Sequence, residues 1–213
     1  MTGAVLWDMD GTLVDSEEYH WLSWRDTMSQ ESIPVSHAQF LETFGQRNDA
    51  ILPRWLGTTA TAEQIQRIGD AKEALYRKLV REGGLRPLPG AKEWVERLHR
   101  EGWRQAIASS APRANVEAVL EVMGMAGDFE AIVSAEDVTA GKPDPQVFLK
   151  AAERLATPPA RCIVVEDAAA GVEAARRAGM RSIGVSRNGA PLPADLAVRS
   201  LADLPNDAFR LDD

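Results

Sequence analysis

The sequence has a single cysteine and no excess of basic residues. Cys162 alone cannot form an internal disulfide, and a reducing cytoplasm is the expected compartment. With 24 basic and 32 acidic residues, the net charge is −8, and the basic residues form no stripe. A role in nucleic-acid binding is therefore disfavoured, because proteins with that role gather Lys and Arg on one face.

Long apolar runs are also missing. The longest ones are the size of a strand, well short of the roughly 20 residues that cross a bilayer, and the N-terminus lacks the basic segment of a signal peptide. We expect no contact with a membrane. No repeat or low-complexity tract is present either. What remains is an ordinary globular composition, 45% apolar and 26% charged, in a chain of 213 residues. This length suits one domain with a smaller insertion.

Five short runs rich in Val, Ile and Ala predict strands. They cover residues 4–7, 104–109, 130–134, 161–166 and 181–186. Because these runs do not alternate with polar residues, we expect strands buried on both faces of a parallel sheet. Helical patterns separate them at 89–102, 112–124, 143–156 and 168–179. The sequence therefore predicts an α/β, Rossmann-like core with right-handed crossovers.

Residues 16–84 interrupt this alternation, since they contain only helical patterns. We predict that they form an all-helical module inserted into a core made of residues 1–15 and 85–213. The module ends in "GGLRPLPG", residues 83–90, and the glycines and prolines of this segment suit a hinge.

Polar side chains follow four of the predicted strands. They are Asp8 and Asp10 after the first strand, Ser109 and Ser110 after the second, Lys142 after the third, and Glu166 and Asp167 after the fourth. A parallel sheet brings its carboxyl ends to one edge, so these groups should share one crevice. Four carboxylates repel one another unless a cation joins them, and oxygen ligands without His or Cys favour a hard ion such as Mg²⁺.

The same crevice suits a phosphorylated ligand. Lys142 and the Ser109 hydroxyl would hold phosphate oxygens, and the backbone N–H groups of Gly11 and Thr12 would form a small anion site. One carboxylate could then act as nucleophile and another could move protons. The segment "AGK" at 140–142 is not a nucleotide-binding P-loop, because Glu136 and Pro143 occupy positions that require Gly and Ser or Thr.

Four segments resemble, in the right order, the motifs of the haloacid-dehalogenase-like hydrolase superfamily. They are "DMDGTLVDS" at 8–16, "IASS" at 107–110, "GKPDP" at 141–145 and "VVEDAAAG" at 164–171. The resemblance implies that Asp8 is a nucleophile forming an aspartyl-phosphate and also a metal ligand. It implies that Asp10 is the general acid and base, with a backbone carbonyl that binds metal.

The third and fourth motifs carry the remaining roles. By the same resemblance, Lys142 and Ser109 bind phosphate, with Ser110 as an alternative to Ser109. Asp167 binds Mg²⁺ with support from Glu166, and the helical module corresponds to the family's small cap. The dehalogenases lack a second aspartate two residues after the nucleophile, so the presence of Asp10 favours phosphoryl transfer.

The segment "SEEYHWLSW" and the order of the cap helices are most similar to the β-phosphoglucomutase-like branch. We therefore expect a Mg²⁺-dependent phosphatase that hydrolyses small phosphorylated metabolites, namely sugar or polyol monophosphates. The expected partner is this substrate alone, for a monomer or weak homo-oligomer. Possible substrate-binding residues are His20, Arg47, Lys72 and Arg113. For His20 a packing role, and for Arg47 and Lys72 a solvated helix charge, are open alternatives.

Three alternatives to this function remain at the level of sequence. Asp8 and Asp10 could belong to a solvated turn or a helix N-cap. The enzyme could be a sugar-phosphate mutase, although in mutases of this branch a cap Arg is followed three residues later by Ser, and here Arg47 is followed by Ala50. The chain could also be a catalytically silent binding module, since a fold alone does not fix function.

Overall fold

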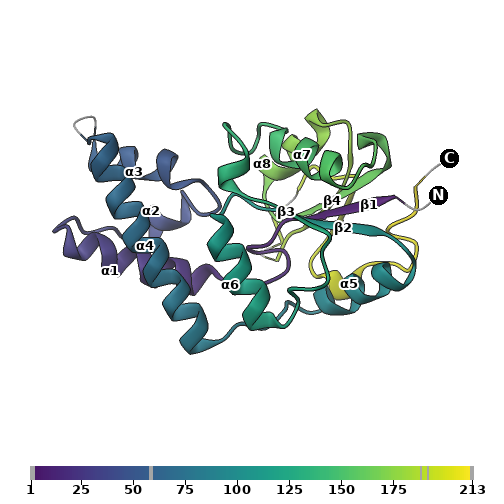
Figure 1. Ribbon diagram of the computed structural model, residues 1–213, viewed down its shortest axis with the longest axis horizontal. Coiled ribbons are helices and arrows are strands. Elements are labelled where there is room, and N and C mark those ends of the chain that lie inside the picture. Colours follow the sequence, from purple (N-terminus) through teal and green to yellow (C-terminus); the bar gives the residue numbers. More distant parts are fainter. Residues whose placement is uncertain (1–2, 58–59, 188, 191, 212–213) are drawn as a thin grey trace.

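A parallel sheet forms the centre of the computed structural model, which describes residues 3–57, 60–187, 189–190 and 192–211 (Figure 1). Its strands are β1 (Ala4–Trp7), β2 (Arg104–Ala108), β3 (Ala131–Val133), β4 (Cys162–Glu166), β5 (Arg181–Val185) and β6 (Leu196–Val198). Their order is β3-β2-β1-β4-β5-β6, and every neighbouring pair is parallel. The Rossmann-like core is confirmed, as are the five predicted strands. The short β6 was not predicted.

Helices cover both faces of this sheet. α5 (Ala91–Arg100) and α6 (Arg113–Met123) pack on one face, and α7 (Gln146–Arg154) and α8 (Ala169–Arg177) pack on the other (Figure 1). Val5 and Trp7 of β1 belong to the first of these cores, whereas Ala4 and Leu6 belong to the second. Successive residues of a strand point to opposite faces of the sheet. Because both faces of β1 are covered by apolar layers, all its residues are apolar.

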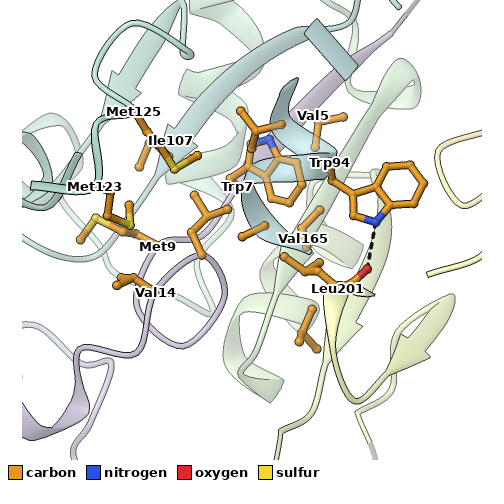
Figure 2. Packing of buried hydrophobic residues seen from close by; sticks show 14 of the residues in the cluster. Val5, Trp7, Met9, Val14, Trp94, Ile107, Met123, Met125, Val165 and Leu201 are labelled. Atoms are coloured by element: carbon orange, nitrogen blue, oxygen red, sulfur yellow. Dashed lines mark hydrogen bonds between the residues drawn. The ribbon is translucent and has the colours of Figure 1, made fainter. Parts of the chain in front are cut away.

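The core on the α5 side includes two tryptophans whose polar atoms are satisfied. Figure 2 shows Trp7 and Trp94 among Val5, Ile107 and Val165. The indole N–H of Trp94 donates to the Leu201 carbonyl at 2.8 Å, and that of Trp7 donates to the Gln105 side chain at 2.9 Å. This core therefore gains large apolar area without leaving a buried donor unpaired.

In the described part of the chain between β1 and α5, the structure has four helices. They are α1 (Glu17–Gln30), α2 (His37–Leu41), α3 (Asn48–Leu56) and α4 (Ala62–Gly83). They form a separate layer at one end of the sheet (Figure 1), with a small core of their own around Trp24, Phe40 and Leu52. The predicted helical cap is confirmed, while its exact limits at residues 16 and 84 stay a prediction. No helix in the described ranges is long and apolar enough to cross a membrane.

The two segments that connect the cap to the core run side by side. Val14 forms an antiparallel bridge with Pro87, and the Leu88 N–H donates to the Leu13 carbonyl at 2.8 Å. Farther out, the Tyr19 hydroxyl donates to the Gly84 carbonyl at 2.7 Å. Beyond this hinge, α4 of the cap packs along α6 of the core (Figure 1).

Candidate active site

The carboxyl ends of β1 and β4 frame the site. β2 pairs with one edge of β1 and β4 pairs with the other, so the strand order reverses at β1. Open α/β sheets bind their ligands at such a reversal. A cavity of about 540 Å³ opens here between cap and core, and residues of both line it. The predicted residues in its wall are Asp8, Asp10, His20, Arg47, Lys72, Ser109, Ser110, Lys142, Glu166 and Asp167.

Three carboxylates crowd together at the base of the cavity. Asp8, Glu166 and Asp167 each offer an oxygen within 4.8 Å of the others. Burial raises the pKa of Asp8 to about 7. Burial and the neighbouring charges of Asp8 and Glu166 raise the pKa of Asp167 to about 9. Burial and mutual repulsion therefore disfavour ionisation of all these carboxylates together. An all-oxygen donor set of this kind fits a hard divalent cation.

Lys142 supplies a positive charge to this cluster. Its Nζ lies 2.6 Å from Asp8 Oδ1 and 2.6 Å from Glu166 Oε1, and only 8% of its side chain is exposed. Burial alone would lower the pKa of Lys142, but the charges of Asp8 and Glu166 raise it above the ordinary value. The ammonium group is therefore fixed beside Asp8 in its charged form.

Glu166 orients this lysine. Its Oε1 accepts from Lys142, and its Oε2 accepts from the Ala168 N–H at 2.7 Å. A Cβ on Gly171 would lie 1.8 Å from Glu166 Oε1, so the close approach of the carboxylate requires glycine there. Because both oxygens of Glu166 already accept hydrogen bonds, Asp8 and Asp167 are better placed than Glu166 to bind a cation.

Asp167→Asn is expected to weaken Mg²⁺ binding and to stabilise the metal-free protein. The amide removes one charge from a mutually repelling cluster but is a poorer ligand. We expect the Mg²⁺ concentration for half-maximal effect to rise roughly tenfold to a hundredfold, the range found when groups around metal ligands are changed. The measurements are thermal unfolding in EDTA and a Mg²⁺ titration of the melting temperature, with exposed Asp207→Asn as the control. An unchanged titration midpoint in Asp167→Asn would remove Asp167 from the metal site.

Asp10 lies apart from the carboxylate cluster and faces the cap. Its Oδ1 accepts a hydrogen bond from the Ser16 hydroxyl and lies 3.4 Å from His20 Nε2. Burial would raise the pKa of Asp10, but the hydrogen bonds from His20 and Ser16 lower it below its ordinary value. The carboxylate form of Asp10 is thus stabilised by donors from α1 and from the segment just before it.

His20 and Lys72 continue this contact into the cap. Lys72 Nζ lies 2.9 Å from His20 Nδ1, and the His20 ring stacks on Tyr76 with ring centroids 4.0 Å apart. Burial and the charge of Lys72 lower the pKa of His20. Lys72 is only 2% exposed and pairs with Glu73 at 3.1 Å. The structure thus places both residues in the cavity wall, where they also bind each other.

The comparisons with known proteins agree with this geometry. A family model described as haloacid dehalogenase-like hydrolase matches residues 2–179. This chain belongs to the haloacid dehalogenase-like hydrolases. β-Phosphoglucomutase of Bacillus subtilis strain 168 is 34% identical over 209 residues, which cover 94% of this chain and 91% of that protein. Hexitol phosphatase B of Escherichia coli K12 is 32% identical over 212 residues, covering 94% and 93%.

A solved structure matches over the same length. The crystal structure of β-phosphoglucomutase from Clostridium difficile has a TM-score of 0.87 and 27% identity, and the match covers 97% of this chain and 95% of that one. The predicted membership of the β-phosphoglucomutase-like branch is confirmed. Because both mutases and phosphatases occur among these haloacid dehalogenase-like relatives, membership alone does not choose between the two activities.

The backbone N–H groups of Gly11 and Thr12, which were predicted to bind an anion, have protein acceptors in this structure. Their N–H groups donate to the carbonyls of Val14 at 2.8 Å and Met9 at 3.3 Å, and among the described residues neither contributes to the cavity wall. Gly11 has another reason to be glycine in this haloacid dehalogenase-like fold. Its φ is +86°, and a Cβ would lie 2.0 Å from Asp167 Oδ2.

The turn offers other donors that the sequence analysis missed. Within the described ranges, the N–H groups of Met9 and Asp10 donate to no protein acceptor. Both follow Asp8 directly, and their place beside a strand-end carboxylate is the signal that could have identified them. Ser109 remains compatible with its predicted role, since its Oγ accepts from the Ala111 N–H at 3.0 Å and its own proton is left to donate.

Arg113 does not reach the cavity. Its guanidinium donates to the Ile132 carbonyl and to Asp137 Oδ2, both at 2.9 Å, and its backbone N–H donates to Glu136. In this structure Arg113, predicted as a possible substrate-binding residue, is therefore bound to the core. A strand carbonyl and an acidic side chain, both distant in sequence, already use its charge.

Arg47 lines the cavity but is bound to the core. Its Nη1 donates to the carbonyls of Ala135 at 2.8 Å and Val138 at 3.1 Å, and its Nη2 pairs with Asp49 at 3.0 Å. Its stem lies against Gly141, where a Cβ would come 3.0 Å from Arg47 Cδ. Arg47 thus joins cap and core directly, a contact that the sequence analysis did not anticipate.

Two further polar residues were missed. Glu73 is 6% exposed and Asn115 is fully buried, although both are normally surface residues. The signal was present for Glu73, because Lys72 and Glu73 interrupt the otherwise apolar stripe of α4 formed by Ile68, Tyr76 and Val80. Charged residues at buried helical positions need partners, and they therefore indicate a site.

Proposed function

We propose that this protein is a Mg²⁺-dependent phosphatase that hydrolyses sugar or polyol monophosphates through an aspartyl-phosphate on Asp8. The observation that carries the proposal is the position of Lys142, 2.6 Å from both Asp8 and Glu166, at the base of a cavity that Asp10 also lines. The proposed setting is the cytoplasm. We also propose that the protein is a monomer or weak homo-oligomer and that it needs no partner besides its substrate.

The proposed metal site uses Asp8, Asp167 and the Asp10 backbone carbonyl, with Glu166 as support. When bound, Mg²⁺ supplies positive charge that offsets the charges of the phosphate and of the carboxylates. The remaining work falls to the protein's own groups. Lys142 and the Ser109 hydroxyl hold phosphate oxygens so that phosphorus lies in line with Asp8.

The reaction consists of two displacements. In the first, an Asp8 oxygen bonds to phosphorus, the bond to the leaving oxygen breaks, and that oxygen takes a proton from Asp10. In the second, water attacks phosphorus, gives its proton to Asp10 and releases Asp8 with inorganic phosphate. Between the two steps Asp10 is ionised, and hydrogen bonds from His20 and Ser16 favour this form.

The cap would exclude bulk water and select the leaving group. A mutase also has to hold a second phosphate on the cap side, and Arg47 is the obvious cation for that purpose. Here Arg47 already binds Asp49 and two carbonyls of the core, and Ala50 stands three residues later. This arrangement favours water over a second hydroxyl as the acceptor.

The choice between hydrolysis and transfer can be measured directly. The protein is incubated with β-glucose 1-phosphate, Mg²⁺ and a trace of the 1,6-bisphosphate, and in parallel with a panel of sugar and hexitol monophosphates. We expect free phosphate from the panel and at most slow formation of glucose 6-phosphate. Rapid formation of glucose 6-phosphate without free phosphate would replace the phosphatase with a mutase. No turnover of any ester would leave a binding module.

A further inference from the structure

A buried carboxylate in the wall of the cavity has no role in the reaction described above. Glu73 is 6% exposed, and its oxygens accept from Lys72 Nζ at 3.1 Å and from Asn48 Nδ2 at 2.8 Å, both within the cap. A third donor, Asn115 Nδ2, comes from the first turn of α6 in the core. An ionised carboxylate in such a place depends on all its donors, because burial disfavours the charge.

Asn115 is held by the cap on both ends of its amide. Its nitrogen donates to Glu73, and its oxygen accepts from Arg77 Nη1 at 2.9 Å. Glu73 and Arg77 lie four residues apart on α4 and therefore on the same face of that helix. Asn115 itself has no exposed surface. The Asn115 amide of the core thus hydrogen-bonds to two cap residues, donating to Glu73 and accepting from Arg77.

These contacts continue to the reacting groups. From Asn115 they lead through Glu73 to Lys72, from Lys72 to His20 Nδ1 at 2.9 Å, and from His20 Nε2 to Asp10 at 3.4 Å. Asn115 and Asp10 belong to the core, whereas the three residues between them belong to the cap. The series is therefore complete only while α4 lies against α6.

We propose that Asn115 is a positioning residue: it holds Glu73, and through Glu73 it keeps Lys72 and His20 ordered against Asp10 only when the cap is closed. When the cap separates from α6, Glu73 exchanges the Asn115 donor for water, and Lys72 loses its fixed partner. Asp10, which exchanges protons with the leaving group and with water in the proposed reaction, is then held in place only around an enclosed substrate. The kinetic consequence rests on the proposed phosphatase function, whereas the ordering of Lys72 does not.

The ordering of Lys72 can be tested without any activity. A short pulse of acetic anhydride is followed by peptide mass spectrometry, with Lys78 and Lys92 as internal standards because their side chains are 65% and 51% exposed. In Asn115→Ala, acetylation of Lys72 relative to these standards should rise by about tenfold or more, since a hydrogen bond to a charged group is lost. Glu73→Gln should give the same result, and Glu117→Ala, on the exposed side of α6, should not.

Kinetics test the link to Asp10. 4-Nitrophenyl phosphate has a leaving group that departs without a proton, whereas a hexitol phosphate needs one. Asn115→Ala should lower kcat for the hexitol phosphate about tenfold more than for the aryl ester, which is part of the roughly 10²–10⁴-fold contribution of general acid–base catalysis. The double variant Asn115→Ala/Glu73→Gln should be no worse than either single variant, because both changes break the same series.

The outcomes separate the two proposals. Unchanged Lys72 acetylation in folded Asn115→Ala would overturn the positioning role, whatever the activity. Equal losses of kcat on both esters would also overturn it, because Asn115 would then act only in closing the cap. If the wild-type protein hydrolyses neither ester but Lys72 becomes reactive in the variants, the phosphatase fails while the ordering by Asn115 stands.

Discussion

Asp8→Asn is expected to abolish phosphatase activity while leaving the protein folded. The amide has nearly the same shape as the carboxylate but cannot attack phosphorus, so kcat should fall by roughly a thousandfold or more. Stability should be retained or increased. Asp8 lies within 4.8 Å of the carboxylates of Glu166 and Asp167, and the substitution removes one charge from this group.

The measurement is kcat at saturating Mg²⁺ together with the melting temperature. Asp203→Asn is the matched control, since it makes the same change at an exposed position in the core. Activity of Asp8→Asn within tenfold of the wild type would assign the nucleophile to another group. Loss of activity with loss of folding would call for Asp8→Glu, which keeps the charge but displaces the attacking oxygen.

Lys142→Ala is expected to produce the second largest effect. The ammonium group is fixed in the cavity where charge develops on the phosphoryl group. Its removal should cost about 3–4 kcal/mol of transition-state stabilisation, a factor of roughly 10²–10³ in kcat/KM. The variant should also unfold at a lower temperature, because Asp8 and Glu166 lose the cation that contacts both of them.

Lys142→Arg separates charge from geometry. It should fold better than Lys142→Ala yet recover only part of the activity, because a planar guanidinium cannot place one donor 2.6 Å from both Asp8 and Glu166. Lys150→Ala, at an exposed position on α7, is the control for loss of a lysine. An unchanged kcat/KM in Lys142→Ala would reduce this residue to a structural ion pair.

The core could be predicted well because its pattern is local. β1 is apolar throughout, and β2, β4 and β5 each contain a short apolar run. The polar groups at the ends of three of these strands meet at one edge by the geometry of parallel strands. β6 was missed for a physical reason. Its three residues, Leu196–Val198, are apolar, but they lie at the edge of the sheet and none is buried, so the run is too short to indicate a strand.

Contacts between distant segments could not be predicted from local patterns. Arg47 binds carbonyls 88 and 91 residues away, and nothing around it in the sequence names those acceptors. Arg113 likewise follows a motif loop closely enough to suggest a ligand contact, but a salt bridge with Asp137 holds its side chain. A charged residue near a motif can indicate a role in ligand binding, but the fold determines which group that residue contacts.

The bridge between Val14 and Pro87 has a consequence for how this architecture can change over evolutionary time. The core itself holds together the two points between which the cap is inserted, so the entropy of closing that loop varies only slowly with the length of the insertion. The inserted helices can therefore diverge or lengthen without disturbing β1, provided that His20 keeps its contact with Asp10. The insertion point therefore allows the cap to vary more freely than the sheet that carries Asp8.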